Sequence, residues 1–130
     1  MSKEMKTFEE FWPYYVRAHS EKGNRRLHFV GTSAALALAA GGVLLRRPSM
    51  LLLAPVVGYG CAWIGHFFIE GNVPATFGHP LWSLKADFVM WSKMLDGSMD
   101  AEVERVMKGE AAQTSVETPT AAASPEATAN

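Results

Sequence analysis

The sequence has only one cysteine, Cys61, and no excess of charge of either sign, because twelve Lys and Arg residues stand against thirteen Asp and Glu residues. A single cysteine excludes an intramolecular disulfide framework. The even charge balance excludes the strong basic excess of nucleic-acid-binding proteins, so we expect no nucleic acid partner. With 130 residues, the chain can form one domain at most.

Charged residues are also missing from two long stretches of the chain. Phe29–Leu45 has 17 residues without a charge, and Pro48–Ile69 has 22, interrupted only by His66. A helix needs roughly 17 to 25 apolar residues to cross a bilayer core. The alternative, two core helices of a soluble bundle, requires polar helices to cover them, and so short a chain lacks these. We therefore predict a two-span helical hairpin in a lipid bilayer.

The positions of Lys and Arg predict how this hairpin is oriented. Six of them precede the first run, only Arg46 and Arg47 lie between the runs, and four follow the second run. Since Lys and Arg are enriched on the cytoplasmic side of membranes, both termini are predicted to be cytoplasmic. A mostly polar segment precedes the first run, so we do not interpret it as a secretory signal. The bacterial inner membrane is the expected location.

The last part of the chain, Gly109–Asn130, has no aromatic residue and only one large aliphatic residue, Val116. Such a segment cannot bury enough apolar surface to offset the entropy that it would lose on ordering. We predict a disordered tail at 109–130, with a specific docking segment as the alternative. Residues 1–108 then form the membrane-embedded domain, with a net charge of +2 from twelve basic and ten acidic residues.

An amphipathic helix is predicted before the hairpin. Thr7 and Glu10 have the spacing of an N-terminal capping box. Apolar residues then recur at helical spacing, and His19 continues the same stripe. Pro13 predicts a kink or a restart within this helix. The density of aromatic residues is typical of a helix in the headgroup region.

A second apolar stripe follows the hairpin, from Leu81 to Leu95, and it predicts a helix at the interface or packed against the hairpin. An amphipathic extension continues from Asp96 to about Lys108. No stretch of the chain shows the alternation of a strand. The predicted fold is therefore all-α: a two-span membrane hairpin with flanking amphipathic helices and a disordered C-terminal tail.

All histidines lie near the ends of the predicted spans that share one membrane face; they are His19, His28, His66 and His79. One such histidine is best explained by a hydrogen bond to a carbonyl or a headgroup. Four together indicate a metal site, because imidazole binds iron, zinc, copper and nickel. Glu70 lies four residues after His66, on the same helix face, where it can ligate the metal or fix a histidine tautomer. Cys61 is interpreted as a packing residue.

These histidines lie in the segments FWPYYVRAHS, NRRLHFVGT, GYGCAWIGHFFIEGNVPATFGHP and SLKADFVMW. The segments resemble the small membrane-protein family typified by the fungal 2-hydroxy fatty acid dioxygenase, over about Phe11 to Leu95. The resemblance implies an Fe(II)-dependent enzyme that uses O2 to shorten a 2-hydroxy fatty acid by one carbon, in α-oxidation. The resemblance implies His19, His28, His66 and His79 as the histidines of the site, which we expect to ligate the metal, with Glu70, Asn24, Asn72 and Asp87 as accompanying polar positions. Of these, we expect Glu70 and Asp87 to be catalytic and Asn24 and Asn72 to bind the substrate; Arg25 or Arg26 can also hold its carboxylate.

A 2-hydroxy acid can chelate iron through a carboxylate oxygen and its hydroxyl, and O2 needs a further position, which leaves three for the protein. We expect His66 and His28 to ligate first, then His19 or His79, with the others orienting ligands or moving protons. Arg25 has the alternative role of anchoring the chain at the membrane face. Two other functions stay open: a non-catalytic protein that binds haem or metal, and a zinc-dependent lipid hydrolase with Glu70 as general base. The sequence predicts no oligomeric state.

Overall fold

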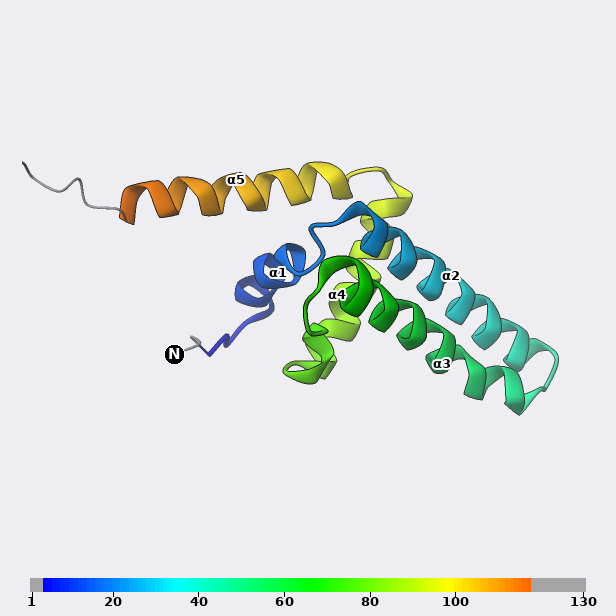
Figure 1. Cartoon of the computed structure of the whole chain (residues 1–130). Helices are drawn as coiled ribbons and strands as arrows, with labels where there is room; N and C mark the ends of the chain where they lie inside the picture. Colours follow the sequence, from blue (N-terminus) through cyan, green and yellow to red (C-terminus); the bar gives the residue numbers. More distant parts are fainter. Residues whose placement is uncertain (1–3, 118–130) are drawn as a thin grey trace, which may run out of the picture.

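The structure, a computed structural model, describes residues 4–117, and the regular structure within them is entirely helical, which confirms the all-α prediction. In chain order the elements are α1 (Phe8–Arg17), α2 (Lys22–Leu44), α3 (Pro48–Ile64), a π-helical turn η1 (Gly65–Glu70), a 3₁₀ turn η2 (Ala75–Phe77), α4 (Pro80–Leu95) and α5 (Met99–Glu117). Helices α2 and α3 form a hairpin that projects from a cluster of α1, α4 and α5 (Figure 1).

The first helix begins where the capping pattern predicts. The Thr7 hydroxyl accepts a hydrogen bond from the Glu10 backbone N–H at 3.3 Å, and the Glu10 carboxylate accepts one from the Lys6 N–H at 2.9 Å. The helix continues through Pro13 without the restart expected there. Pro13 leaves the Glu9 carbonyl without an intrahelical donor, but Glu9 is exposed, so solvent can hydrate this carbonyl.

The hairpin matches the predicted pair of spans. Two helical segments of 23 residues, Lys22–Leu44 and Pro48–Glu70, are long and apolar enough to cross a membrane. In the apolar 18-residue stretch of each segment, only 17% and 22% of the stretch is buried in the structure. The two segments are therefore not the covered core of a soluble bundle. Helix α2 begins at Lys22, before the uncharged run that starts at Phe29, because an α-helix also accommodates charged residues. Arg46, with a φ of 53°, makes the turn between the helices, and Pro48 begins α3 at the position that proline favours.

Two glycines allow α2 and α3 to approach closely. A Cβ on Gly31 would lie 2.7 Å from the Cβ of Cys61, and a Cβ on Gly42 would lie 2.8 Å from Cγ of Leu51. Glycine at such positions permits close packing of membrane helices. Cys61 therefore lies at the contact between the helices, in agreement with its interpretation as a packing residue.

A small apolar core joins α1, α4 and α5; its fully buried members include Phe11, Tyr15, Val16, Ala86, Met90 and Met99. The predicted apolar stripe of α4 packs in part against the hairpin: Trp91 stacks on Phe29 and donates to the Ser33 hydroxyl at 3.0 Å, while Leu81 and Leu95 are exposed. The inner face of α4 carries smaller or flexible side chains, Ser83, Ala86 and Met90. Such a face allows α4 to lie close to its neighbours, while Leu84 and Phe88 face a cavity between α4 and the hairpin.

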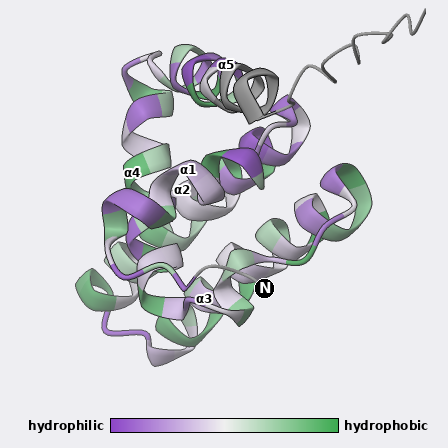
Figure 2. Ribbon diagram, turned by 90° about the vertical axis from the view of Figure 1, so that its left-hand side faces the viewer, coloured by the Kyte–Doolittle hydropathy of each residue, from purple (hydrophilic) through white to green (hydrophobic). Residues whose placement is uncertain are grey.

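The last helix, α5, packs Val103 and Val106 onto this core, and its first part carries both hydrophobic and hydrophilic residues (Figure 2). It does not end near Lys108 but continues to Glu117, through the first part of the segment expected to be disordered. Glu110, Ala111 and Ala112 favour helix, and extending an existing helix is much easier than starting one. The remainder of the predicted tail lies outside the described residues.

Candidate metal centre

Three of the four histidines meet in one cluster, which we call the histidine triad: His19, His28 and His66. His19 follows the end of α1, His28 lies in the second turn of α2, and His66 belongs to η1. Their ring centroids are 4.5 to 4.9 Å apart and their planes are nearly perpendicular. One nitrogen of each ring lies within 4.8 Å of the others, and the three side chains are at most 4% exposed.

In each triad ring, Nδ1 faces an oxygen. His19 Nδ1 lies 2.6 Å from the Tyr15 carbonyl, His28 Nδ1 lies 3.0 Å from the Asn24 carbonyl, and His66 Nδ1 lies 2.7 Å from Oδ1 of Asn72. Because these oxygens only accept hydrogen bonds, each Nδ1 carries the proton and each Nε2 keeps a free lone pair. This is the arrangement that prepares histidines to bind a metal through Nε2.

The lone pairs on two of these nitrogens point at each other. His19 Nε2 and His28 Nε2 lie 3.1 Å apart, with no proton to share when both rings are protonated at Nδ1. Two lone pairs at this distance repel unless a cation lies between them. Adjacent nitrogen ligands of an octahedral ion lie about 3.0 Å apart for metal–nitrogen distances of about 2.1 Å. The triad therefore fits a metal ion held by three neutral imidazoles.

The chain turns sharply after η1 to bring Asn72 back to His66. Gly71 adopts the left-handed conformation, with φ of 70°, which glycine tolerates best. The Asn72 N–H then donates to the His66 carbonyl at 3.0 Å, and its side-chain Nδ2 donates to the Ala18 carbonyl at 3.1 Å. This second bond orients the amide so that Oδ1 faces His66. Asn72, expected at the substrate, thus holds a triad ring.

Glu70 does not join the triad, although its spacing from His66 suggested that it would ligate or orient a histidine. Its carboxylate accepts hydrogen bonds from the Glu21 N–H at 2.7 Å, from Asn24 Nδ2 at 3.3 Å and from the Ser20 hydroxyl at 3.3 Å. These donors lie at the start of α2, where a negative charge is favourable. Glu70 therefore ties the end of the second span to the loop that carries His19.

Arg25 also supports that loop from the other side. Its guanidinium, on a residue only 4% exposed, donates to the carbonyls of His19 and Ser20 at 2.8 and 2.7 Å and to Asp100 at 3.0 Å. Asn24 packs against Gly65, where any Cβ would collide with Asn24 Oδ1. Both residues were predicted to bind substrate, and in the structure their side chains contact the loop and helices around the histidines.

His79 lies apart from the triad. It occupies the N-cap position of α4, where its ring stacks on Trp82 and meets the edge of Phe11, with centroid distances of 5.4 Å in both cases. It is not among the histidines whose ring nitrogens lie within 4.8 Å of one another. The structure therefore brings together three of the four predicted ligands and leaves His79 in an aromatic cluster.

A second group of polar side chains faces the triad across a small pocket. Asp87, Tyr15 and Ser83 line this pocket together with the three histidines. The Tyr15 hydroxyl donates to the Asp87 carboxylate. Ser83 is 2% exposed, and its hydroxyl has no hydrogen-bond partner among the described residues. The pocket thus contains a buried polar atom that a bound ligand can satisfy.

Burial determines the charge state of these groups. It lowers the pKa of His19 well below its usual value, helped by the neighbouring His28 and His66, so this ring is neutral and able to ligate. Burial raises the pKa of Asp87 to about 6, although the hydrogen bond from Tyr15 opposes the shift. It also raises the pKa of Tyr15, so that the phenol keeps its proton at neutral pH. Asp87 can therefore exchange a proton near neutral pH.

Neither Ser83 nor Tyr15 was singled out as a site residue from the sequence. Both have a signal that could have identified them. Ser83 precedes Asp87 by four residues, so the two share a helix face, and Tyr15 precedes His19 by the same spacing.

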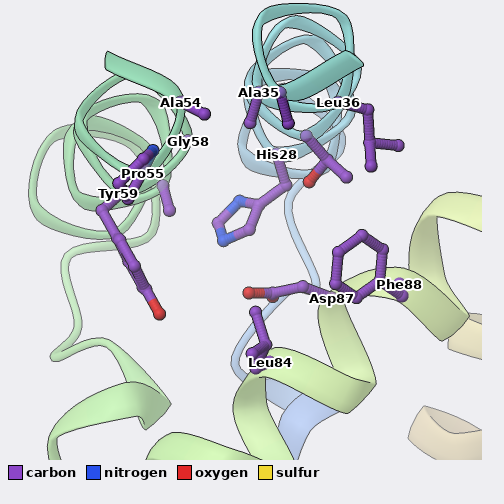
Figure 3. Close-up of a pocket in the computed structure, with 13 residues that line it drawn as sticks. His28, Ala35, Leu36, Ala54, Pro55, Gly58, Tyr59, Leu84, Asp87 and Phe88 are labelled. Atoms are coloured by element: carbon purple, nitrogen blue, oxygen red, sulfur yellow. The ribbon is translucent and has the colours of Figure 1, made fainter. Parts of the chain in front are cut away.

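A larger cavity of about 230 Å³ extends from the triad into the hairpin. His28 and Asp87 reach into it from α2 and α4, while Ala35 of α2 and Ala54 and Gly58 of α3 line it farther along (Figure 3). The site therefore consists of the histidine triad, a polar wall formed by Ser83 and Asp87 of α4, and the apolar cavity that extends into the hairpin.

Comparison with known proteins gives one match. The family model described as 2-hydroxy-palmitic acid dioxygenase Mpo1-like matches residues 5–99, which include the triad, His79 and Asp87. No curated protein and no solved structure matches the chain significantly.

Proposed function

Because the chain belongs to the Mpo1-like family, we propose that it is a membrane-embedded dioxygenase that shortens 2-hydroxy fatty acids by one carbon. The observation that carries the proposal is the convergence of three unprotonated Nε2 atoms in a buried pocket. The overall reaction balances when one 2-hydroxy acid and one O2 give carbon dioxide, water and a fatty acid one carbon shorter.

Iron is the metal that fits this chemistry, and His19, His28 and His66 would hold it. Three imidazoles leave positions open on an octahedral ion, as in non-haem Fe(II) oxygenases. When bound, Fe(II) would supply the redox chemistry that O2 requires and coordination sites for the carboxylate and hydroxyl oxygens of the substrate. The buried triad excludes water from the reacting groups.

The wall on α4 supports the substrate head group in this proposal. Asp87, held in place by the Tyr15 hydroxyl, accepts the hydrogen bond of the substrate hydroxyl and can take up its proton. The Ser83 hydroxyl donates to a substrate oxygen, which satisfies its unpartnered polar atom. These groups and the triad lie on opposite sides of the head group and fix its orientation.

The hairpin supports a membrane location for this reaction. Its apolar helices are largely exposed, so a bilayer is the environment that covers them. The Lys and Arg distribution favours the bacterial inner membrane with both termini in the cytoplasm. The triad, at the end of the hairpin opposite the Arg46 turn, then lies at the cytoplasmic face.

The test is turnover by the purified protein. The protein in detergent receives Fe(II), O2 and 2-hydroxypalmitate, and the expected products are pentadecanoic acid and carbon dioxide. His66→Ala should lose bound iron and at least 99% of the activity, since it removes a ligand. His79→Ala should keep the bound iron, because that ring lies outside the triad.

Each alternative has its own outcome in the same preparation. An iron-loaded protein that forms no odd-chain acid contradicts the dioxygenase proposal. An intense Soret band indicates a haem-binding protein, and bound zinc with turnover that needs no O2 indicates a hydrolase.

A further inference from the structure

The cavity that leads away from the triad has a polar end and an apolar end. His28 and Asp87 form the polar end, next to the metal centre. From there the cavity continues between α2, α3 and α4 (Figure 3). It is lined mainly by alanine and other apolar side chains, which include Ala39 and Ala54. An apolar space that begins at a reactive centre has the form of a tail-binding site.

Small side chains create this space. Ala35 and Ala39 on α2 and Ala54 and Gly58 on α3 line it, where larger residues would fill the gap between the helices. The two helices touch closely at Gly31 and Gly42, on either side of this region along α2. The helices are therefore held at a fixed separation, and the alanines leave a channel of about 230 Å³.

We propose that this channel binds the acyl chain of the 2-hydroxy acid, with its methyl end at Ala39 and Ala54, and that it determines chain length. The inference rests on the proposed function, because the head group at the triad is what places the chain here. Asp87 and His28 lie at the start of the channel, so a substrate held by its head group must direct its tail into it.

The length of the channel supports this occupant. His28 and Ala39 are eleven residues apart on α2, which corresponds to about 16 Å along the helix axis. An extended hydrocarbon advances about 1.25 Å per carbon, so the channel holds about thirteen carbons. That is close to the tail of 2-hydroxypalmitic acid, the substrate in the description of the family. Ala35, seven residues from His28, lies about 10 Å along, at about the eighth carbon.

The experiment compares three leucine variants of neighbouring alanines. Ala39→Leu blocks the far end of the channel, and Ala35→Leu blocks it midway. Ala40→Leu is the matched control, because Ala40 is exposed on the same helix and does not line the channel. Binding of radiolabelled 2-hydroxypalmitic and 2-hydroxydodecanoic acids is measured without O2 on each purified protein, and turnover of both acids is measured with O2.

We expect Ala39→Leu to weaken binding of the longer acid at least tenfold and to leave the shorter acid unchanged, since each methylene displaced from an apolar site costs about fourfold in affinity. Ala35→Leu should weaken both acids, and Ala40→Leu neither. The ratio of kcat/KM values for the two acids should follow the same order.

The outcomes separate this inference from the proposed function. If binding follows the expected order but no variant, nor the unaltered protein, turns over either acid, the channel is supported and the dioxygenase proposal fails. If the protein is active and Ala39→Leu and Ala35→Leu keep the original chain-length preference, the channel does not hold the substrate tail. An unchanged preference is also expected if a bilayer lipid fills the channel. Either way, that result overturns the inference.

Discussion

At the scale of single residues, the chemistry of the site depends on which nitrogen of each imidazole carries a proton. The Nδ1–H groups of His19, His28 and His66 donate hydrogen bonds to two backbone carbonyls and to the Asn72 side-chain amide oxygen. Only the partner of His66 is a side chain, so only that contact can be removed by substitution. The sequence predicted a tautomer-fixing partner for a histidine, but at Glu70.

Asn72→Ala is therefore expected to weaken metal binding rather than substrate binding. It removes the acceptor for His66 Nδ1 and the bond to the Ala18 carbonyl. Loss of such a partner of a metal-ligating histidine lowers metal affinity about 10- to 100-fold. Competition with a metal chelator measures the change. A higher KM for the 2-hydroxy acid with unchanged metal affinity would show that Asn72 contacts substrate instead.

At the scale of helices, the separation of α2 and α3 determines whether the triad can form. His28 lies on α2 and His66 follows α3, so any force that separates the two helices moves two ligands apart. Gly31 lies between them, at the contact with Cys61 and with the carbonyl of Gly58.

Gly31→Ala should disrupt this contact. Its Cβ would lie 2.7 Å from Cys61 Cβ and 3.2 Å from the Gly58 oxygen, and backbone cannot move aside without separating the helices. Overpacking of this kind destabilises by about 1–3 kcal/mol, and we also expect reduced metal content. Gly60→Ala is the control on the same hairpin, because its Cβ would meet no atom within 4 Å. Equal thermal stability and metal content in both variants would contradict the assigned contact.

The docking of α5 on α1 is predicted to depend on pH. Trp12 Nε1 donates to the Glu102 carboxylate at 2.7 Å, and hydrogen bonds from Arg105 and Trp12 lower the pKa of Glu102 below its usual 4.5. A carboxyl with a lowered pKa in the folded state contributes stability that is fully present above pH 4.5 and is lost as pH falls through the lower value. We therefore expect the docking of α5 to weaken as the pH falls below 4.5.

Trp12 fluorescence, obtained as the difference from the Trp12→Phe protein, reports this transition. Glu102→Gln keeps an oxygen acceptor for Trp12 but cannot titrate, so its transition should depend less on pH than that of the unaltered protein. An identical pH midpoint in the two proteins would assign the transition to another group.

At the scale of the whole molecule, the hairpin separates two ends of different chemistry. The triad, α1, α4 and α5 gather at one end, and the Arg46 turn lies at the other (Figure 1). If the hairpin crosses a membrane, substrate and metal must approach from the side that holds both flanking regions.

Cysteine labelling tests that orientation. In a Cys61→Ser background, the single substitutions Glu9→Cys and Arg46→Cys introduce thiols at two exposed positions, one on α1 and one in the turn between α2 and α3. With both termini in the cytoplasm, an impermeant maleimide added to spheroplasts should label Arg46→Cys at once and Glu9→Cys only after lysis. The reverse pattern would invert the topology, and labelling of both before lysis would argue against a membrane hairpin.

The sequence by itself determined the features that depend on neighbours along the chain. Two uncharged runs predicted the hairpin, Thr7 and Glu10 predicted the start of α1, and the hairpin geometry predicted that histidines from different segments share one end. These predictions succeed because apolar length and helix capping are local properties.

Only the tertiary structure decided which side chains meet at that end. Because of the π-helical turn and the left-handed Gly71, the hydrogen-bond partner of His66 is Asn72 and not Glu70. Arg25 and Glu70 instead form hydrogen bonds with the loop after α1. The start of α4 places His79 against aromatic rings and turns Ser83 and Asp87 toward the triad. These pairings join residues far apart in the chain through irregular backbone, and periodicity carries no information about such contacts.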